Sequence, residues 1–305
     1  TISDYDKEEI KRSFSIHTSL VPIPWGDVKV NILDTPGFFD FVGEVEEAVS
    51  VADAAIIVVS GKSGIQTGTK RAWEICEKYK LPRIIFVTEM DIDNASYRQV
   101  VEDLQALYGK KIAPFHLPIR ENEKFVGYVN VAKQKGRRFT TNSEYVECDV
   151  PEYSKEYLKR YRESLLEAVA ETDEELMDKY FSGEDFTPVE MSTALRTSVS
   201  DSSIVPVLMG SGLHAQGTHI LLEAIEKYFP SPNKGVIAGM NLKTDKVFAA
   251  DYDANKELTV RVFKTIADPF IGKFSLIKVC SGILKAGDTV YNPKRECEEK
   301  ISRLY

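Results

Sequence analysis

Three short segments of the chain bring together residue types that could do chemistry. The first is Asp34-Thr35-Pro36-Gly37, which follows an alternating apolar stretch at residues 28–34. An aspartate at a strand end can hold Mg²⁺ through a water molecule, and a glycine lets its N–H approach a terminal phosphate because it has no Cβ. By itself this segment is equally typical of an ordinary strand-to-turn junction.

The other two segments carry groups that could recognise a base. Thr88-Glu89-Met90-Asp91 ends an apolar run, and a carboxylate at Asp91 could accept both N1–H and N2–H of guanine, which selects guanine over adenine. Gly210-Ser211-Gly212-Leu213 ends another apolar run, and its small residues would let backbone amides reach the base. Each segment alone is a weak signal, so their relative placement decides their value.

The pattern between these segments predicts the sheet that would position them. Apolar runs alternate with amphipathic stretches, which is typical of βαβ units and of an α/β fold with a doubly wound, mostly parallel sheet. Strands are expected at residues 28–34, 54–59, 83–87 and 205–209, and helices at 44–51, 66–79, 95–108 and 221–228. Ligands bind beyond the carboxyl ends of such strands, so the three segments are expected at successive strand ends of one sheet. This is the layout of a GTPase.

Two further regions interrupt or follow the α/β pattern. Between about His116 and Ser203 we expect an inserted α+β subdomain, with a strand near 127–131 and a helix at 154–171. The helix carries Tyr157, Tyr161 and Leu165 as its core stripe. Arg137 and Arg138, which follow each other in the sequence, are expected to be solvated. After Pro230-Ser-Pro232, strand patterns at 246–252, 258–266, 274–279 and 289–291 predict part of an antiparallel β-barrel.

Composition excludes several classes of protein. The chain has 305 residues, and its 39 Lys+Arg against 47 Asp+Glu give a net charge of −8, which argues against coating nucleic acid through bulk charge. Four cysteines without CxxC spacing indicate neither a zinc site nor a disulfide framework, and are typical of the cytoplasm. No apolar run approaches the ~18 residues that a membrane span requires.

The segment from Asp34 to Glu46, Asp-Thr-Pro-Gly-Phe-Phe-Asp-Phe-Val-Gly-Glu-Val-Glu, resembles translational GTPases, in particular elongation factor G. The strand at 82–87 is similar to the one before that family's guanine-reading motif, and 206–212 is similar to its last base-contacting loop. Residues 228–232 resemble the segment that leaves the family's G domain. The start of its second domain resembles Phe263-Lys264, Asp268-Pro269-Phe270, Gly272-Lys273, Ser281-Gly282 and Gly287. The insertion falls where elongation factor G carries its G′ subdomain, so the resemblance covers essentially the whole chain.

This resemblance implies a ribosome-associated GTPase that uses GTP/GDP and Mg²⁺ in translocation or a related step of translation. By position, Asp34 takes the role of holding Mg²⁺ through water, and Ser15 matches the switch threonine that coordinates the metal. Gly37 takes the γ-phosphate amide role. The base contacts fall on Thr88, Asp91, Ser211 and Gly212. The implied partners are rRNA and ribosomal proteins, stalk proteins among them, for a cytoplasmic protein without a membrane anchor; the fragment itself is expected to be monomeric.

Two departures from the family pattern bear on activity. Phe38 stands where the family has the histidine that orients the attacking water, and losing such a side chain costs ~10²–10⁴-fold in rate, so Phe38 is expected to be non-catalytic. Thr88-Glu89 replaces Asn-Lys of the guanine motif, and two lost contacts of ~1–3 kcal/mol each would weaken guanine binding roughly 30-fold to 10⁴-fold. An alternative is therefore a degenerate paralogue that binds the ribosome as a regulatory, recycling or protective factor with little hydrolysis.

The phosphate loop Gly-x-x-x-x-Gly-Lys-Ser/Thr is missing from the sequence. Gly61-Lys62-Ser63 looks similar, but the required first glycine would fall at Ile56 inside an apolar strand, so a surface turn is expected instead. In the family the loop lies upstream of the switch region, which here means before Thr1. We therefore expect residues 1–235 to be a G domain without its first strand and phosphate loop, and 236–305 an incomplete β-barrel domain II. GTPase activity belongs to the full-length parent, and the fragment alone is expected to be inactive.

Overall fold

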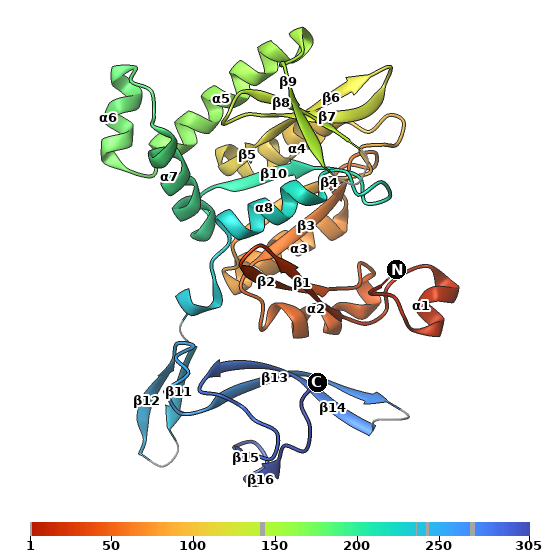
Figure 1. The fold of residues 1–305 in the computed structure, drawn as a ribbon, viewed down its shortest axis with the longest axis vertical. Coiled ribbons are helices and arrows are strands. Elements are labelled where there is room, and N and C mark those ends of the chain that lie inside the picture. The colour runs from red at the N-terminus through yellow and green to blue at the C-terminus, as the bar shows by residue number, and fades with distance from the viewer. Residues whose placement is uncertain (1, 141–143, 236, 242–243, 269–271) are drawn as a thin grey trace. The chain divides into compact units, whose positions relative to one another are not determined.

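The computed structural model describes residues 2–140, 144–235, 237–241, 244–268 and 272–305 (Figure 1). The chain divides into two compact units. The first unit comprises Thr1–Val45 and Ala52–Pro230, and the second comprises Glu46–Val51 and Ser231–Tyr305.

A four-stranded parallel sheet forms the centre of the first unit. Its order is β3 (Ala55–Ser60), β4 (Arg83–Thr88), β10 (Val205–Met209) and β5 (Ile112–Pro114). Helix α3 (Thr67–Tyr79) connects β3 to β4, α4 (Tyr97–Tyr108) lies between β4 and β5, and α8 (Thr218–Tyr228) follows β10. Strands β4 and β10 are buried along almost their entire length, which explains their continuous apolar runs. The predicted α/β fold with a parallel sheet is confirmed.

The hairpin of β1 (Ser19–Trp25) and β2 (Val28–Asp34) forms a separate two-stranded antiparallel sheet. The expectation that β2 would end in the same sheet as β4 and β10 is therefore wrong. Among the described strands, β2 pairs with β1 alone and β3 pairs with β4 alone, so each has one edge without a partner strand. Before the hairpin lies α1 (Lys7–Arg12), and after it lie a short 3₁₀ turn, η1 (Phe39–Phe41), and α2 (Val42–Val49).

The inserted subdomain combines an antiparallel sheet with three helices, as an α+β insertion should (Figure 1). The sheet runs in the order β6 (His116–Glu121), β7 (Lys124–Asn130), β8 (Lys135–Phe139) and β9 (Tyr145–Cys148). The 3₁₀ turns η2 (Gly109–Lys111) and η3 (Glu152–Ser154) precede β5 and α5, and the helices are α5 (Lys155–Ala170), α6 (Glu174–Ser182) and α7 (Pro188–Ser200).

Two expectations about side chains of the insertion have different outcomes. Tyr161 and Leu165 of α5 are buried as expected, whereas Tyr157 is only half-buried and its hydroxyl accepts a hydrogen bond from Arg98. Arg137 is only 8% exposed, so the expectation of a solvated arginine is wrong. Its guanidinium lies 4.0 Å from the ring centroid of Tyr145 and donates to the hydroxyl oxygen of Tyr128 at 3.0 Å, contacts that compensate its burial.

The strands of the second unit pair antiparallel, as expected of part of an antiparallel barrel. After η4 (Pro232–Lys234), they are β11 (Ile237–Asn241), β12 (Lys246–Ala250), β13 (Thr259–Asp268), β14 (Gly272–Ser281), β15 (Thr289–Asn292) and β16 (Cys297–Lys300). β11 pairs with β12, β13 pairs with β14, and β15 pairs with β16, each pair forming a two-stranded sheet. Pro269 and Phe270, which contributed to the family resemblance, lie outside the described residues.

Candidate functional site

Asp91 lies in the loop between β4 and α4, and backbone hydrogen bonds hold this loop to the sheet. The N–H of Gly61 donates to the carbonyl of Thr88 at 2.9 Å. A side chain at Gly61 would place its Cβ 3.0 Å from that same carbonyl oxygen, so the close approach favours glycine. Met90 is fully buried, and its N–H donates to the carbonyl of Gly210 at 3.2 Å. The loop is thus anchored immediately before Asp91, whose side chain is 17% exposed.

The loop after β10 turns back on itself so tightly that glycine is required at two positions. A Cβ on Gly210 would lie 2.2 Å from the carbonyl oxygen of Gln216. Gly217 has a φ of +83°, and its Cβ would lie 2.4 Å from the carbonyl oxygen of Met209. Ser211 is fully buried, and its N–H donates to the Gln216 carbonyl at 2.8 Å. This turn presents Gly212 and His214 beyond the end of β10.

The two loops meet beyond the carboxyl ends of β4 and β10, which are neighbours in the parallel sheet. The position of a Cβ on Gly212 is 4.0 Å from Oγ1 of Thr88, and Nε2 of His214 is 3.7 Å from Oδ2 of Asp91. The structure therefore brings Thr88, Asp91, Ser211 and Gly212 together. This arrangement offers a carboxylate that can accept two N–H groups, next to backbone without a covering side chain. His214 was not expected near Asp91 from the sequence.

Asp34 and Gly37 lie at the end of the β1–β2 hairpin. Asp34 is the last residue of β2 and pairs in register with Ser19. The space that a Cβ would occupy at Gly37 is open, so a ligand atom could approach its backbone. Phe38 follows with 53% of its surface exposed, and its ring packs against Phe14 with centroids 4.7 Å apart. Phe38 therefore joins the turn after β2 to the segment that carries Ser15.

Ser15 belongs to a segment that is organised around a buried carboxylate. Glu9 is 1% exposed, and its Oε1 accepts N–H groups from Ile16 at 2.9 Å and His17 at 3.0 Å. The hydroxyl of Ser15 donates to Oδ1 of Asp4 at 2.7 Å. Sequence reasoning missed Glu9, although the capping-box pattern at the start of α1 was a usable signal.

Glu89 is engaged by the neighbouring strand. Its carboxylate accepts a hydrogen bond from the hydroxyl of Ser60 at the end of β3. Glu89 also has a φ of +60°, the left-handed region. Oγ of Ser60 accepts N–H groups from Lys62 at 3.3 Å and Ser63 at 3.0 Å. Lys62 is exposed in this turn, which confirms that Gly61-Lys62-Ser63 is a surface turn.

Asp34 and Ser15 carry oxygen donors of the chemical type that a magnesium ion shared with phosphate oxygens requires. Mg²⁺ is usually bound by one or two protein groups together with substrate phosphates, and Asp34 and Ser15 supply a carboxylate and a hydroxyl of the required hard type. In the described part of the chain, no group of three or more His, Cys, Asp and Glu side chains is placed to hold a metal ion by itself. None of the helices described there combines the length and apolar content needed to cross a membrane.

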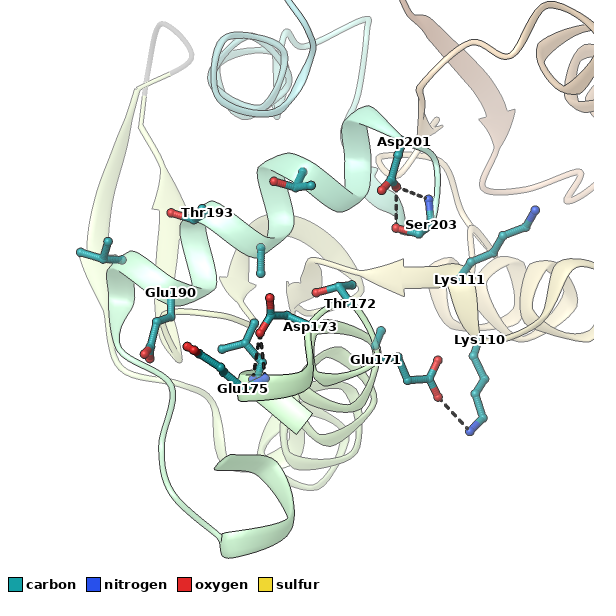
Figure 2. Close-up of a pocket in the computed structure, with 15 residues that line it drawn as sticks. Lys110, Lys111, Glu171, Thr172, Asp173, Glu175, Glu190, Thr193, Asp201 and Ser203 are labelled. Atoms are coloured by element: carbon teal, nitrogen blue, oxygen red, sulfur yellow. Dashed lines mark hydrogen bonds and ion pairs between the residues drawn. The ribbon is translucent and has the colours of Figure 1, made fainter. Parts of the chain in front are cut away.

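A cavity of about 620 Å³ lies in the insertion, away from these residues (Figure 2). It is lined by parts of α5, α6 and α7 together with Lys110 and Lys111, and Figure 2 shows several acidic side chains around it. These groups are used within the fold. Asp173 accepts the N–H of Glu175 at 2.9 Å as the cap of α6, and Asp201 accepts the N–H of Ser203 at 2.9 Å. The cavity therefore offers no argument for a second site.

Comparison with known proteins agrees with this geometry. Residues 1–231 match the family described as the elongation factor Tu GTP binding domain. The crystal structure of ttk003000868 from Thermus thermophilus is similar with a TM-score of 0.84 at 33% sequence identity. That similarity covers 99% of this chain and 42% of the Thermus chain, so this chain spans less than half the length of that protein. The chain belongs to the family of the elongation factor Tu GTP-binding domain.

Proposed function

We propose that the chain is part of an elongation factor G-like GTPase that acts on the ribosome, in translocation or a related step of translation. The observation that carries the proposal is the meeting of Asp91, Thr88 and Gly212 at neighbouring parallel strand ends. A carboxylate there can read guanine, and the family match supports a guanine nucleotide as the ligand. Mg²⁺ is the metal that accompanies such nucleotides.

Each residue then has a defined task. Asp91 accepts N1–H and N2–H of guanine, and Ser211 with Gly212 makes the last base contact. Asp34 holds Mg²⁺ through water, and Gly37 offers its N–H to the γ-phosphate. Ser15 is a metal ligand in this proposal. Its hydroxyl would therefore give up its hydrogen bond to Asp4 and bind the ion instead.

The domain organisation in this proposal follows from the open edges of β2 and β3. Residues 1–235 are a G domain without its first strand and phosphate loop, and the unpaired edges, seen among the described strands, support a further strand between β2 and β3 in the parent protein. Residues 236–305 are an incomplete β-barrel domain II. GTP hydrolysis, coupled to conformational change on the ribosome, then belongs to the full-length parent, and the fragment alone is inactive.

The partners in this proposal are rRNA and ribosomal proteins, including stalk proteins, which places the parent in the cytoplasm. A net charge of −8 favours docking through shape and local patches rather than through a general attraction to RNA. The fragment itself is proposed to be monomeric.

Ribosome-stimulated phosphate release from the full-length protein tests the proposal. Asp34→Ala should lower the rate by about 10²-fold or more, because the magnesium-bound water loses its acceptor and metal positioning is usually worth several kcal/mol. Asp27→Ala is the matched control, since Asp27 is exposed on the turn of the same hairpin. A wild-type rate no higher than that of Asp34→Ala would contradict the enzyme proposal.

One observation favours the alternative of a ribosome-binding paralogue with little hydrolysis. Phe38 has no hydrogen-bonding atom, and its ring is already packed against Phe14 rather than placed to orient a water molecule. If stimulated release fails while the full-length protein still binds ribosomes, this regulatory or protective role replaces the enzyme proposal.

A further inference from the structure

Two backbone carbonyls of the loop that carries Asp91 are bonded by a side chain from outside that loop. On the sheet side, two backbone hydrogen bonds hold the loop. The N–H of Met90 donates to the carbonyl of Gly210 at 3.2 Å, and the N–H of Ser96 donates to the carbonyl of Gly61 at 2.8 Å. The carbonyls of Met90 and Ala95 are instead bonded by Arg120, a residue of the inserted subdomain. These two carbonyls flank Asp91 on either side.

One nitrogen of Arg120 bridges both carbonyls. Its Nη2 group donates to the carbonyl of Met90 at 2.9 Å and to that of Ala95 at 3.0 Å, while Nη1 donates to the carbonyl of Glu123 at 2.6 Å. The planar guanidinium presents several donors in a fixed arrangement, which a lysine ammonium on a flexible stem cannot reproduce. Arg120 therefore closes the loop from 90 to 95 as a clamp and attaches it to β6.

The backbone of Arg120 is itself fixed. The register of β6 on β7 shifts between Ile119 and Arg120, and such bulges redirect the side chain beside them. The hydroxyl of Tyr153 accepts the N–H of Arg120 at 2.9 Å and donates to its carbonyl at 3.0 Å. Tyr153 lies in η3 at the start of α5, so three elements of the insertion determine where the guanidinium lies.

The surroundings of Arg120 differ from those of an ordinary surface cation. Burial lowers the pKa of its guanidinium, against the opposing effects of Glu123 and Tyr153, although an arginine remains charged. Its hydrogen-bond partners in this cluster are neutral carbonyls, and those of Met90 and Ala95 are part-buried, so losing their donor costs free energy. Removing the clamp would therefore change the conformation of the loop.

We infer that Arg120 is a positioning residue for guanine recognition, through which the inserted subdomain sets the orientation of Asp91. The inference rests on the proposed role of Asp91. Arg120 does not contact the base in this proposal; it holds the carbonyls on both sides of the residue that does. The sequence carries no signal for this role, because Arg120 is separated from Met90 by 30 residues and by a change of subdomain.

The test compares GDP with inosine diphosphate in the full-length protein, using calorimetry. Inosine lacks the 2-amino group, so it can make only one of the two hydrogen bonds to Asp91 and depends less on the carboxylate's orientation. Arg120→Lys should raise the Kd for GDP about 10-fold and that for inosine diphosphate about 2-fold, so that discrimination shrinks about 5-fold. Tyr153→Phe should also reduce the discrimination between GDP and inosine diphosphate, by a smaller factor. Arg138→Lys, on strand β8 of the same sheet and paired with Glu121, is the matched control and should leave both affinities unchanged.

Each outcome decides the inference. Equal weakening of both nucleotides by Arg120→Lys, with or without a lower thermal midpoint, would mean that Arg120 only supports the fold, and would overturn the inference. Unchanged affinities would overturn it as well. The proposed function is tested separately by the wild-type protein and Asp91→Asn: if the wild type does not prefer GDP to inosine diphosphate, guanine reading by Asp91 is wrong and the role of Arg120 falls with it.

Discussion

Two carboxylates near the end of β4 have different environments, and the difference decides which can serve a ligand. Glu89 is bonded to the hydroxyl of Ser60, and it has a left-handed backbone conformation that turns it to the end of β3. Asp91 lies two residues later, keeps 17% of its side chain exposed, and is 3.7 Å from the imidazole of His214. The imidazole beside Asp91 is exposed, whereas the carboxylate of Glu89 is already bonded to Ser60, so in the proposed function Asp91 is the carboxylate that reads the base.

Asp91→Asn should change the base preference of the full-length protein from guanine to xanthine. The aspartate accepts two N–H groups from guanine, whereas an asparagine presents one acceptor and one donor, and xanthine carries a carbonyl where guanine has its amino group. GDP binding should weaken about 10²-fold, since a buried donor is left without its acceptor, while xanthosine diphosphate binding strengthens. Calorimetry with both nucleotides measures this. Asp93→Asn, exposed in the same loop, is the control, and retained GDP affinity in Asp91→Asn would contradict the assignment.

The sequence predicts the placement of Asp91 and Gly212 because neighbouring parallel strands bring their carboxyl ends together. Other contacts near these residues depend on side chains whose partners are distant in sequence. The bond from Ser60 to Glu89 spans 29 residues, and that from Arg120 to Met90 spans 30. No local pattern specifies such pairs, because they follow from the packing of whole elements. The hydrogen bond from the hydroxyl of Ser15 to Asp4 was also not predicted from the sequence, because a hydroxyl has many possible acceptors.

At the scale of elements, burial decides which strands the sequence reveals. Strands β3, β4 and β10 have continuous apolar runs, and their predicted bounds differ from the observed ones by at most one residue. Strand β1 was not predicted, because it contains Pro22 and Pro24, which are tolerated mainly at sheet edges. Strand β8 was missed because its charged residues resemble a loop, although Arg137 there lies buried against Tyr145.

His116, at the start of β6, gives the inserted sheet a dependence on pH. It is 4% exposed, its ring lies edge-on to Tyr128 at 4.8 Å, and burial lowers its pKa to about 3, with Arg137 adding to the effect. The ordinary pKa of histidine is about 6.5, so between these values the unfolded chain binds a proton that the folded chain does not. The stabilising effect of neutral His116 is therefore complete above about pH 6.5 and is lost as the pH falls toward 3.

His116→Phe should remove part of this pH dependence while keeping the aromatic contact with Tyr128. In the wild-type 305-residue chain, His116 should lower the free energy of unfolding by up to about 1.4 kcal/mol per pH unit below about 6.5. Urea unfolding at about pH 7 and about pH 5 measures the difference between wild type and variant. If the variant loses as much stability as the wild type over this interval, His116 is not the titrating group.

At the scale of the whole molecule, the edge of the central sheet is more exposed than its sequence suggests. Strand β3 is apolar up to its last residue, yet Val58 is 60% exposed, while Ile57 and Val59 on the other face are 4% and 2% exposed. Apolar strands of parallel sheets are normally covered on both faces. We propose that a segment of the parent protein covers this face of β3, which would account for a valine at an exposed position.

Val58→Lys tests this proposal by comparing the 305-residue chain with the full-length protein. In the chain the lysine would lie in water and change the free energy of unfolding by no more than about 0.5 kcal/mol. In the parent the same lysine would be buried under the added segment, and burying an unpaired charge should cost several kcal/mol, on the order of 3. Val146→Lys, on β9 with 52% exposure, is the control and should be tolerated in both proteins. Equal tolerance of Val58→Lys in both would mean that nothing in the parent covers this face of β3, and the proposed G-domain completion would be wrong.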